Sequence, residues 1–524
     1  MSQSTYYLTT PLYYVNAPPH LGHAYTTVIA DVLARYHRLR GDEVFFLTGT
    51  DEHGQKIQLS SSAAGQEPTQ FVESMVPAFK QLWSTLNVSY NYFIRTTDES
   101  HQRGVQAALV QLLTAGDIYK GAYEGWYCVP DETFWPSLTI TPGKTPLCPE
   151  CQRPVQQIKE ENYFFRLGRY QSWLQQYIHN HPEFIHPLSR RNEVLGFLEQ
   201  PLQDLCISRP EERLVWGIEM PSPPFESGYV TYVWFDALLN YITAVGYPDA
   251  AHARWLFWPA DLHLIGKDIL RPHAVYWPIM LHALGLEPPT TIAVHGWWLV
   301  EGQKMSKSRG NIVDPHAVVA EYGVDAYRYF LLREVPFGQD GTFSEAAMDK
   351  RYNSDLANDF GNLVFRTLTM IEKYFGGEVP SFRETQFRLS DGSIYRGPGG
   401  WVQLPLPHEW DFRLVLENVW LEIDRANKLI DDKKPWVLAK GGEAQQRELA
   451  VILGALADLL RALAVWLWPV MPATCENLWS QLGCPGKLDG VCWDDAWKVS
   501  ATSGQRIQKG LPLFPRRDLQ PKSS

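Results

Sequence analysis

The chain has 524 residues, of which 45% are hydrophobic, and its formal net charge is −11. The length suggests about three domains. The net negative charge disfavours a protein that binds nucleic acid over most of its surface, although it does not exclude a local basic track. Residues 1–10 lack the charged and apolar regions of a signal peptide, and the longest apolar stretch, residues 451–468, is broken by Asp458 and Arg461. We therefore expect a soluble, cytoplasmic protein, which excludes the secreted and membrane-spanning classes.

The N-terminal part of the chain has the pattern of an α/β fold. Residues 6–10 are β-rich and residues 44–48 form a continuous apolar run, while the segment 21–40 between them has apolar residues at helical spacing. Strand, helix and strand within about 45 residues predict a βαβ unit. Further helical patterns cover residues 69–86 and 98–113.

The pattern changes over residues 121–165, where glycine, proline and cysteine become frequent and long periodic segments stop. Strand-like and helical segments resume over 230–242 and 262–284, and 292–294 is another apolar strand. We therefore expect a parallel sheet split by a small inserted module.

After about residue 343 the chain is mostly helical. The predicted helices cover residues 346–373, 412–431, 445–468 and 473–482. Residues 380–407, rich in Gly, Pro and Ser, predict a long surface loop, and residues 510–524 predict a polar tail.

His20 and His23 open the first predicted helix, directly after a strand and a proline turn. Their spacing places both imidazoles on one helical face, at a helix end whose free N–H groups favour anions. There they can donate to phosphate oxygens as negative charge builds up in a transition state, and Gly22 leaves room for a base or ribose. The structural alternative is a pair of capping or core histidines.

Lys304 and Lys307 lie in a segment with two serines and flanking glycines, Gly302-Gln-Lys-Met-Ser-Lys-Ser-Arg-Gly310. Flexible ammonium groups on a polar loop suit a polyphosphate whose charge moves during a reaction. A solvated charged turn is the alternative. Because the two segments occur in this order, we interpret them as two halves of one nucleotide site.

These two segments resemble the signature sequences of class I aminoacyl-tRNA synthetases, with Leu21 in place of the commoner Ile. Three other segments resemble the methionyl-tRNA synthetases: Thr48-Gly-Thr-Asp51-Glu-His-Gly54, Tyr232-Val-Trp-Phe-Asp-Ala237 and Ile265-Gly-Lys-Asp-Ile269. The resemblance covers roughly residues 5 to 515. It implies an α/β fold with a split Rossmann-type parallel sheet, an inserted zinc-knuckle-like connective module and an α-helical anticodon-binding bundle.

The resemblance also implies a reaction. ATP and methionine would give methionyl-adenylate and pyrophosphate, with Mg²⁺ accompanying ATP, and the aminoacyl group would then move to the 3′ end of tRNA(Met), initiator tRNA included. Catalysis would consist of positioning and charge stabilisation, since the substrate carboxylate is the nucleophile. The implied ATP-binding residues are His20, Gly22, His23, Lys304, Ser306 and Lys307.

An aromatic pocket is implied for the methionine side chain, and thioether–aromatic contacts are favourable. The implied residues are Leu12, Tyr14, Asp51, Trp234, Ala237, Leu238, Tyr241, Ile269, His273 and Trp277. The spacing of residues 269, 273 and 277 by four predicts that they share one helical face. For any single tryptophan, an ordinary place in the core is the alternative.

Two charged residues complete the implied catalytic set. Asp51 follows a predicted strand at the carboxyl edge of the sheet, where open α/β folds bind ligands, and by resemblance it holds the substrate α-amino group. Arg209 aligns with an arginine that the family uses in activation. A strand-end cap and a surface arginine are the respective alternatives.

The inserted module contains Cys148-Pro-Glu-Cys151, one half of a zinc knuckle. The family's upstream Cys-x-x-Cys reads Cys128-Val-Pro-Asp131 here. Three thiolates and one carboxylate can hold Zn²⁺, but the hard Asp131 ligand should lower the affinity, so a knuckle without zinc stays open as an alternative. The module is also too short for the editing domain of the valine, isoleucine and leucine enzymes.

The helical region resembles an anticodon-binding bundle. By resemblance Asn362, Arg366 and Trp436 read the anticodon, and exposed anticodon bases do stack on aromatic rings and bond to Asn and Arg. A helix-packing role is the alternative for Trp436. Because no OB-fold follows the bundle in this sequence, we expect a monomer.

We expect residues 1–115 and 229–300 to form the two halves of the Rossmann domain, with the connective insertion at 116–228 and its knuckle at about 121–165. Residues 301–345 would carry the lysine loop and stem contacts, residues 346–518 the anticodon-binding domain, and 519–524 the tail. The rival interpretations are a cysteinyl enzyme, which would use zinc in its active site, a small adenylyltransferase, which would not need the bundle, and a synthetase-derived RNA-binding protein, which should have eroded signatures.

Overall fold

The computed structural model describes residues 4–128, 133–135, 145–149, 152–304, 311–382, 387–392, 394–395, 411–498 and 501–518. Within these residues, six strands form a parallel sheet of order β3-β2-β1-β11-β12-β7. These strands are β1 (Thr5–Tyr14), β2 (Glu43–Asp51), β3 (Tyr92–Arg95), β7 (Ile185–His186), β11 (Leu262–Gly266) and β12 (Thr291–His295).

The sheet joins two distant parts of the chain, as the sequence predicted. Strand β1 pairs with β2 on one side and with β11 on the other, with Leu8 opposite Leu262. The strand order therefore reverses between β1 and β11, and open α/β sheets bind ligands at such a switch point, beyond the carboxyl ends of the strands. The short strands β3 and β7 were not predicted, and β7 comes from the range 116–228.

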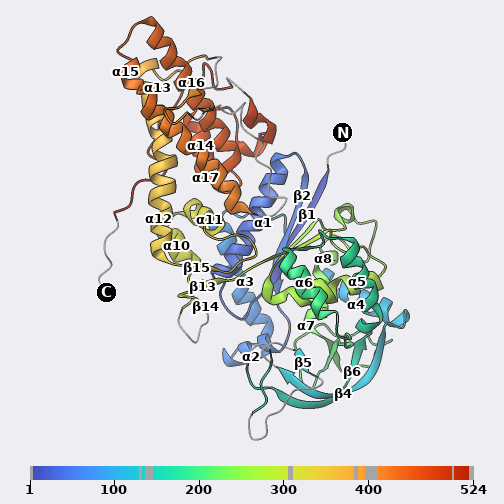
Figure 1. Ribbon diagram of the computed structural model, residues 1–524. Helices are drawn as coiled ribbons and strands as arrows, with labels where there is room; N and C mark the ends of the chain where they lie inside the picture. The colour runs from blue at the N-terminus through green and yellow to red at the C-terminus, as the bar shows by residue number, and fades with distance from the viewer. Residues whose placement is uncertain are drawn as a thin grey trace.

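Helices flank this sheet (Figure 1). The predicted helices at 21–40, 69–86 and 98–113 are present within a few residues, whereas the helices at 55–63, 171–180 and 188–197 were not predicted. Helix α1 is the longest of them, and its inner face is fully buried through Val28, Ile29 and Leu33. The flanking helices are α1 (Leu21–Leu39), α2 (Gln55–Ala63), α3 (Pro68–Thr85), α4 (Glu99–Thr114), α5 (Gln171–Asn180), α6 (Leu188–Phe197), α7 (Val233–Leu238), α8 (Asn240–Thr243) and α9 (Trp277–Ala283).

The inserted module is an antiparallel sheet of order β5-β4-β6-β8. Its long hairpin pairs β4 and β6 from Ile118 opposite Phe165 to Tyr127 opposite Gln156, and it projects from the molecule at the end away from the bundle (Figure 1). The strands are β4 (Ile118–Cys128), β5 (Thr133–Trp135), β6 (Gln156–Phe165) and β8 (Leu205–Cys206), and a ribbon of β9 (Ser208–Pro210) and β10 (Tyr229–Thr231) leads back to α7.

A small sheet and two helices connect the parallel sheet to the C-terminal bundle. They are β13 (Trp298–Val300), β14 (Gln303–Lys304), α10 (Pro315–Tyr322), α11 (Val324–Arg333) and β15 (Gly341–Phe343). The bundle then contains α12 (Glu345–Arg351), a π-helical segment (Tyr352–Gly361), α13 (Asn362–Phe375), α14 (Phe412–Lys433), α15 (Pro435–Leu438), α16 (Glu443–Leu467) and α17 (Pro472–Gln481). The range 380–407, predicted as a loop, holds a short antiparallel pair, β16 (Phe387–Arg388) and β17 (Ile394–Tyr395).

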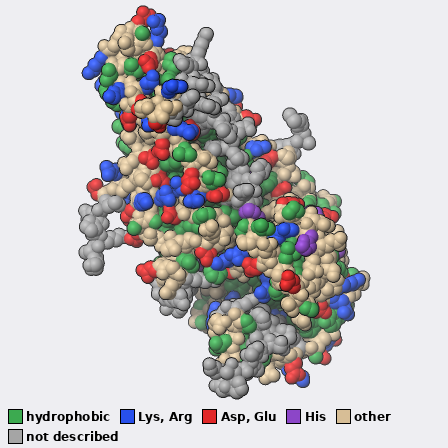
Figure 2. Space-filling model, viewed as in Figure 1, with side chains coloured by type: hydrophobic (Ala, Val, Ile, Leu, Met, Phe, Trp, Pro, Cys, Tyr) green, Lys and Arg blue, Asp and Glu red, His purple; other side chains and the backbone are tan. Residues whose placement is uncertain are grey.

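Helix α16 is the core of the bundle. It is the single helix in the described ranges that is long and apolar enough to cross a membrane, yet 89% of its most apolar window is buried inside the protein. Both of its interior charges have partners: Asp458 accepts a hydrogen bond from the Thr502 hydroxyl at 2.7 Å, and Arg461 donates to the Asp495 carbonyl at 2.6 Å. On the face shown in Figure 2, basic and acidic side chains are interspersed over this bundle.

Candidate active site

A cavity of about 1020 Å³ lies at the switch point between β1 and β11. It collects residues from β1, the start of α1, the end of β2, α7 and the segment after β11. Most residues predicted to bind ATP or methionine line it: Leu12, Tyr14, His20, Gly22, His23, Asp51, Trp234, Ala237, Leu238, Tyr241, Ile269 and His273. The fold therefore brings together segments that are more than 250 residues apart in the sequence.

The histidine doublet forms the N-cap of α1 and also lines the cavity. The Gly22 N–H donates to His20 Nδ1 at 3.0 Å, and the His20 N–H donates to His23 Nδ1 at 3.1 Å. The two rings stack with their centroids 3.9 Å apart. Since each Nδ1 accepts a backbone hydrogen bond, the proton of each neutral imidazole is on Nε2. The capping alternative is thus confirmed, and the phosphate-binding role of the pair stays a prediction.

The electrostatics of His23 favour a neutral imidazole. Burial, and then the neighbouring His20, lower the pKa of His23 well below its usual value. A neutral ring with its proton on Nε2 can still donate one hydrogen bond to an anion at the helix end, whose free N–H groups and dipole add to the attraction. This end of the cavity suits phosphate.

Asp51 is the last residue of β2 and lies opposite Tyr14 of β1 in the register of the sheet. The next residue, Glu52, is buried and accepts two hydrogen bonds from Arg95, at 2.7 Å and 2.8 Å. This bidentate pair fixes the turn after β2, and of residues 51 to 53 Asp51 is the one that lines the cavity. A carboxylate at the cavity wall can bind an ammonium group at short range.

The aromatic wall is held by a chain of hydrogen bonds. His273 donates through Nδ1 to the Ile269 carbonyl at 2.9 Å, so its Nε2 accepts from the Tyr241 hydroxyl at 2.8 Å. Burial lowers the pKa of His273 to about 4, which keeps the ring uncharged at neutral pH. Trp234 meets His273 edge-on, with centroids 6.1 Å apart. An aromatic wall whose histidine is uncharged and whose polar groups are oriented by hydrogen bonds fits an apolar side chain such as a thioether.

Trp277 does not line this cavity. It is fully buried behind it, and its Nε1–H donates to His263 at 3.0 Å. The expectation that residues 269, 273 and 277 share one α-helical face is wrong, because residues Pro272–Tyr276 form a π-helical turn that breaks the regular spacing. Trp277 therefore supports the wall through His263, which stacks on Tyr241 with centroids 4.1 Å apart.

Four lining residues at the carboxyl ends of β11 and β12 were not among the predicted site residues. Lys267 lies 4.0 Å over the Trp297 ring and pairs with Asp340 at 2.7 Å, and the Trp297 Nε1–H donates to Asp268 at 3.1 Å. His295 contacts Thr26 of α1 at 2.7 Å. Lys267 and Asp268 lie in Gly266-Lys-Asp, within one of the segments that resemble the family, so that signal could have found them.

The lysine loop starts next to the cavity. Trp298 lines the cavity and begins β13, and β13 pairs with β14 so that Leu299 lies opposite Lys304. The backbone of Lys304 is therefore one hairpin away from the site. The predicted residues Ser306 and Lys307, like the side chain of Lys304, lie outside the described residues.

Comparison with known proteins identifies the family. Residues 6–158 and 144–368 match the family model described as tRNA synthetases class I (M). The methionine–tRNA ligase of Caldanaerobacter subterraneus subsp. tengcongensis is 47% identical over 99% of this chain and 80% of its own length, and that of Clostridium tetani is 46% identical over 100% of this chain and 80% of its own length. The chain belongs to the class I methionyl-tRNA synthetase family. The family resemblance and the fold class inferred from the sequence are confirmed.

A solved structure of the family agrees with this assignment. The chain matches Mycobacterium tuberculosis methionyl-tRNA synthetase in complex with methionyl-adenylate with a TM-score of 0.92 and 41% identity, covering 98% of this chain and 100% of that one. That relative therefore binds the activated form of methionine on a fold that this chain shares along nearly its whole length.

Arg209, the other residue carried over from the methionyl-tRNA synthetase family, lies away from the cavity. It is buried, donates to the Ser208 carbonyl at 2.7 Å, and lies 4.4 Å from the ring centroid of Tyr232. The alternative of a surface arginine is wrong. Its role in activation stays a prediction, and Tyr232, which lines the cavity, connects it to the site.

Only part of the synthetase knuckle is described. Cys128 and Cys148 are both buried and pack in one small hydrophobic cluster with Val155, so these two thiols lie in the same part of the module. A turn follows Cys148, whose carbonyl accepts from the Gln152 N–H at 2.9 Å. The other two candidate ligands, Asp131 and Cys151, lie outside the described residues, and no group of three or more potential ligands occurs within them.

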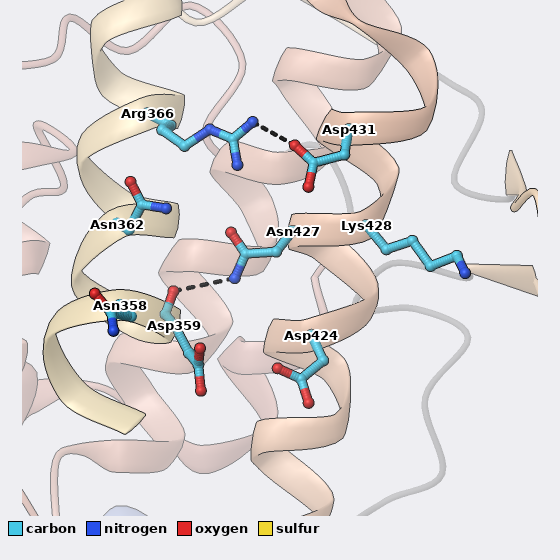
Figure 3. Close-up of a pocket in the computed structure, with 8 residues that line it drawn as sticks. All are labelled: Asn358, Asp359, Asn362, Arg366, Asp424, Asn427, Lys428 and Asp431. Atoms are coloured by element: carbon cyan, nitrogen blue, oxygen red, sulfur yellow. Dashed lines mark hydrogen bonds and ion pairs between the residues drawn. The ribbon is translucent and has the colours of Figure 1, made fainter. Parts of the chain in front are cut away.

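Two of the three predicted anticodon residues of this synthetase fold face a groove between α13 and α14 (Figure 3). Asn362 and Arg366 line it, and Arg366 pairs with Asp431 of α14 at 2.7 Å. The groove has a volume of about 370 Å³ and is lined by Asn358, Asp359, Asn362, Arg366, Asp424, Asn427, Lys428 and Asp431. Asn358 continues the row of residues 362 and 366 by the same interval of four, a signal that the sequence contained.

Trp436 lies on α15, directly after α14, and its side chain is 42% exposed. Part of the ring is therefore accessible to a ligand, and its anticodon role stays a prediction. An exposed aromatic ring has the chemistry for unpaired bases, which stack on such rings, and the amide and guanidinium groups of the groove can bond to base edges between its three aspartates.

Proposed function

We propose that this chain activates methionine with ATP in the cavity at the switch point and transfers the aminoacyl group to tRNA(Met), initiator tRNA included. A methionine carboxylate oxygen attacks the α-phosphorus of ATP, the new O–P bond forms, and the bond to pyrophosphate breaks. A ribose hydroxyl of the terminal tRNA nucleotide then attacks the carbonyl carbon, and AMP leaves. The observation that carries this proposal is the convergence of the doublet, Asp51 and the aromatic wall on one cavity.

Asp51 binds the α-ammonium group, and Trp234, Tyr241 and His273 enclose the thioether side chain. His20 and His23 donate Nε2–H to phosphate oxygens, and Lys304 and Lys307 add positive charge as it is needed. None of these groups forms a covalent bond with the substrate, so catalysis consists of positioning and charge stabilisation. Mg²⁺ would accompany ATP and would neutralise part of the phosphate charge.

Pyrophosphate exchange measured across the twenty amino acids tests this function. We expect methionine to support exchange far better than any other amino acid, and the chain to charge tRNA(Met). Exchange driven by cysteine, or exchange without charging of any tRNA, would favour the two enzyme rivals instead. We also expect a monomer in the cytoplasm, which light scattering and cell fractionation would check.

Zinc in the knuckle is a separate proposal. Cys128, Asp131, Cys148 and Cys151 would hold it tetrahedrally, and the ion would stabilise the tip of the β4–β6 hairpin. Metal analysis of gently purified protein decides: about one zinc per chain supports the site, while less than about 0.2 contradicts it.

A further inference from the structure

Asp236 is a fully buried carboxylate that the proposed reaction does not use. It belongs to α7, between Trp234 and Ala237, and unlike these two neighbours it points away from the cavity. Acidic side chains are almost never fully buried without partners, so its surroundings call for an explanation.

Each oxygen of Asp236 binds a different histidine. His53 Nδ1 donates to Oδ2 and His101 Nε2 donates to Oδ1, both at 2.7 Å, and both histidines are buried. Burial alone would raise the pKa of Asp236, but His53 and then His101 outweigh it and lower the pKa, so the group is an ionised acceptor. His101 is fixed in turn by Thr243 of α8, at 2.8 Å.

These bonds connect two walls of the cavity that are distant in the sequence. His53 is two residues after Asp51, and its carbonyl accepts a hydrogen bond from the Tyr14 hydroxyl at 2.8 Å. Asp236 is two residues after Trp234. The Asp236 carboxylate therefore connects the end of β2, which contains Asp51, to α7, which contains Trp234. The doublet on α1 is instead held by the backbone at the start of its own helix.

We propose that Asp236 is a positioning residue that sets the distance between Asp51 and Trp234, and thereby the affinity for the amino acid substrate. This rests on the proposed function. The two anchors bind the two ends of one small molecule, so a shift of either wall weakens both contacts at once. ATP, bound at the other end of the cavity, does not depend on this distance.

The test measures KM for methionine and for ATP separately in pyrophosphate exchange. For Asp236→Ala we expect the methionine KM to rise at least ~10-fold while the ATP KM stays within ~3-fold, since misplaced positioning groups cost up to ~10²-fold. Asp236→Asn should restore most of the affinity, because the amide can accept from His53 and donate to the other tautomer of His101. Equal increases in both KM values would overturn the proposal.

A double-mutant cycle separates positioning from general damage. Because His53 acts through the same carboxylate, the double variant His53→Ala/Asp236→Ala should raise the methionine KM no more than the larger single change. Additive effects would contradict the link. If Asp236→Ala does not fold, His53→Ala alone keeps the second oxygen bonded to His101 and must show the same difference between the two KM values.

Asp458→Ala is the matched control, since Asp458 is an equally buried acid bonded to Thr502 in the distant bundle. It should lower the melting temperature without raising the methionine KM. A rise as large as that of Asp236→Ala would show that lost stability is the cause. Failure of the unmodified chain to catalyse methionine-dependent exchange would instead refute the proposed function.

Discussion

At the scale of single residues, the backbone N–H groups at the start of α1 determine what the histidine doublet can do. Both Nδ1 atoms accept capping hydrogen bonds, so the proton of each neutral ring is on Nε2, and both residues line the cavity. The cap thus selects the tautomer that the proposed phosphate contact needs.

Two substitutions of His23 separate helix capping by Nδ1 from hydrogen-bond donation by Nε2. An asparagine oxygen can take the place of Nδ1 and keep the cap but offers nothing at the position of Nε2, whereas a glutamine amide reaches that position. We expect His23→Asn to lower the rate of pyrophosphate exchange by ~10²-fold, as for a lost transition-state donor, with a melting temperature near that of the unmodified chain. His23→Gln should be the more active of the two. The opposite order of activities would mean that the cap, and not the donor, is what catalysis needs.

At the scale of elements, long periodic segments were predictable and local irregularities were not. The helix 21–40 and the strands 44–48 and 292–294 were predicted within a few residues, because each has a clear period or a continuous apolar run. The π-helical turn at Pro272–Tyr276 has no such signature, so the site of Trp277 was misjudged. Strand β7 has two residues, which is too short for a period to be visible in the sequence.

Arg366 gives a prediction at this scale, because it lies in a row on one helix and is oriented by Asp431 of the next. We expect Arg366→Ala to lower kcat/KM for tRNA charging by ~10- to 100-fold, the size of one lost base contact of about 1–3 kcal/mol, and to leave pyrophosphate exchange unchanged. Arg447→Ala is the control, because Arg447 forms an exposed ion pair with Glu443 outside the groove. Equal losses of charging and exchange in Arg366→Ala would indicate misfolding.

The same groove contains Asp359. Burial raises the pKa of this acid to about 6, and the nearby Asp424 and Asp355 add to the increase. A raised pKa means that the folded state prefers the protonated acid, so ionisation above about pH 4 to 6 costs stability. We therefore expect Asp359→Asn to raise the melting temperature at pH 7.5 and to change it little at pH 4. Its backbone carbonyl still accepts from Asn427, so the local fold is kept. A stabilisation of the same size at both pH values would rule out this electrostatic cause.

At the scale of the whole molecule, Arg328 connects parts of the chain that no local pattern relates. Its guanidinium is fully buried and binds Asp31 of α1, 297 residues away, at 2.7 Å. It also donates to the carbonyl of Leu86 after α3 and to those of Pro469 and Val470 after α16. The sequence predicted the α/β part and the helical bundle separately. The contacts between them involve side chains that meet only in the folded chain, so no local pattern could predict them.

Because the bonds of Arg328 connect the α/β part to the bundle, we expect the stability of each part to depend on the other. Removing one partner of a buried ion pair leaves an uncompensated charge, so Arg328→Ala should cost about 3–5 kcal/mol of unfolding free energy. Burial raises the pKa of Asp31, but Arg328 and Arg35 outweigh it and lower the pKa to about 2. The stabilisation from Asp31 is therefore present above its unfolded pKa of about 3.9 and is lost as the pH falls from there towards 2.

Urea unfolding at pH 7 and pH 3, followed by tryptophan fluorescence and by loss of pyrophosphate exchange, measures both effects. The unmodified chain should lose stability between these pH values, and Arg328→Ala should lose less, because only Arg35 is then left to lower the pKa of Asp31. Arg103→Ala, which removes an exposed ion pair with Glu99, should change stability by about 0–1 kcal/mol. The contradicting result is that Arg328→Ala loses its activity and its native fluorescence at the same urea concentrations as the unmodified chain. The two parts would then not be coupled through this residue. The continuous apolar core from α1 to α16 would hold them together without it.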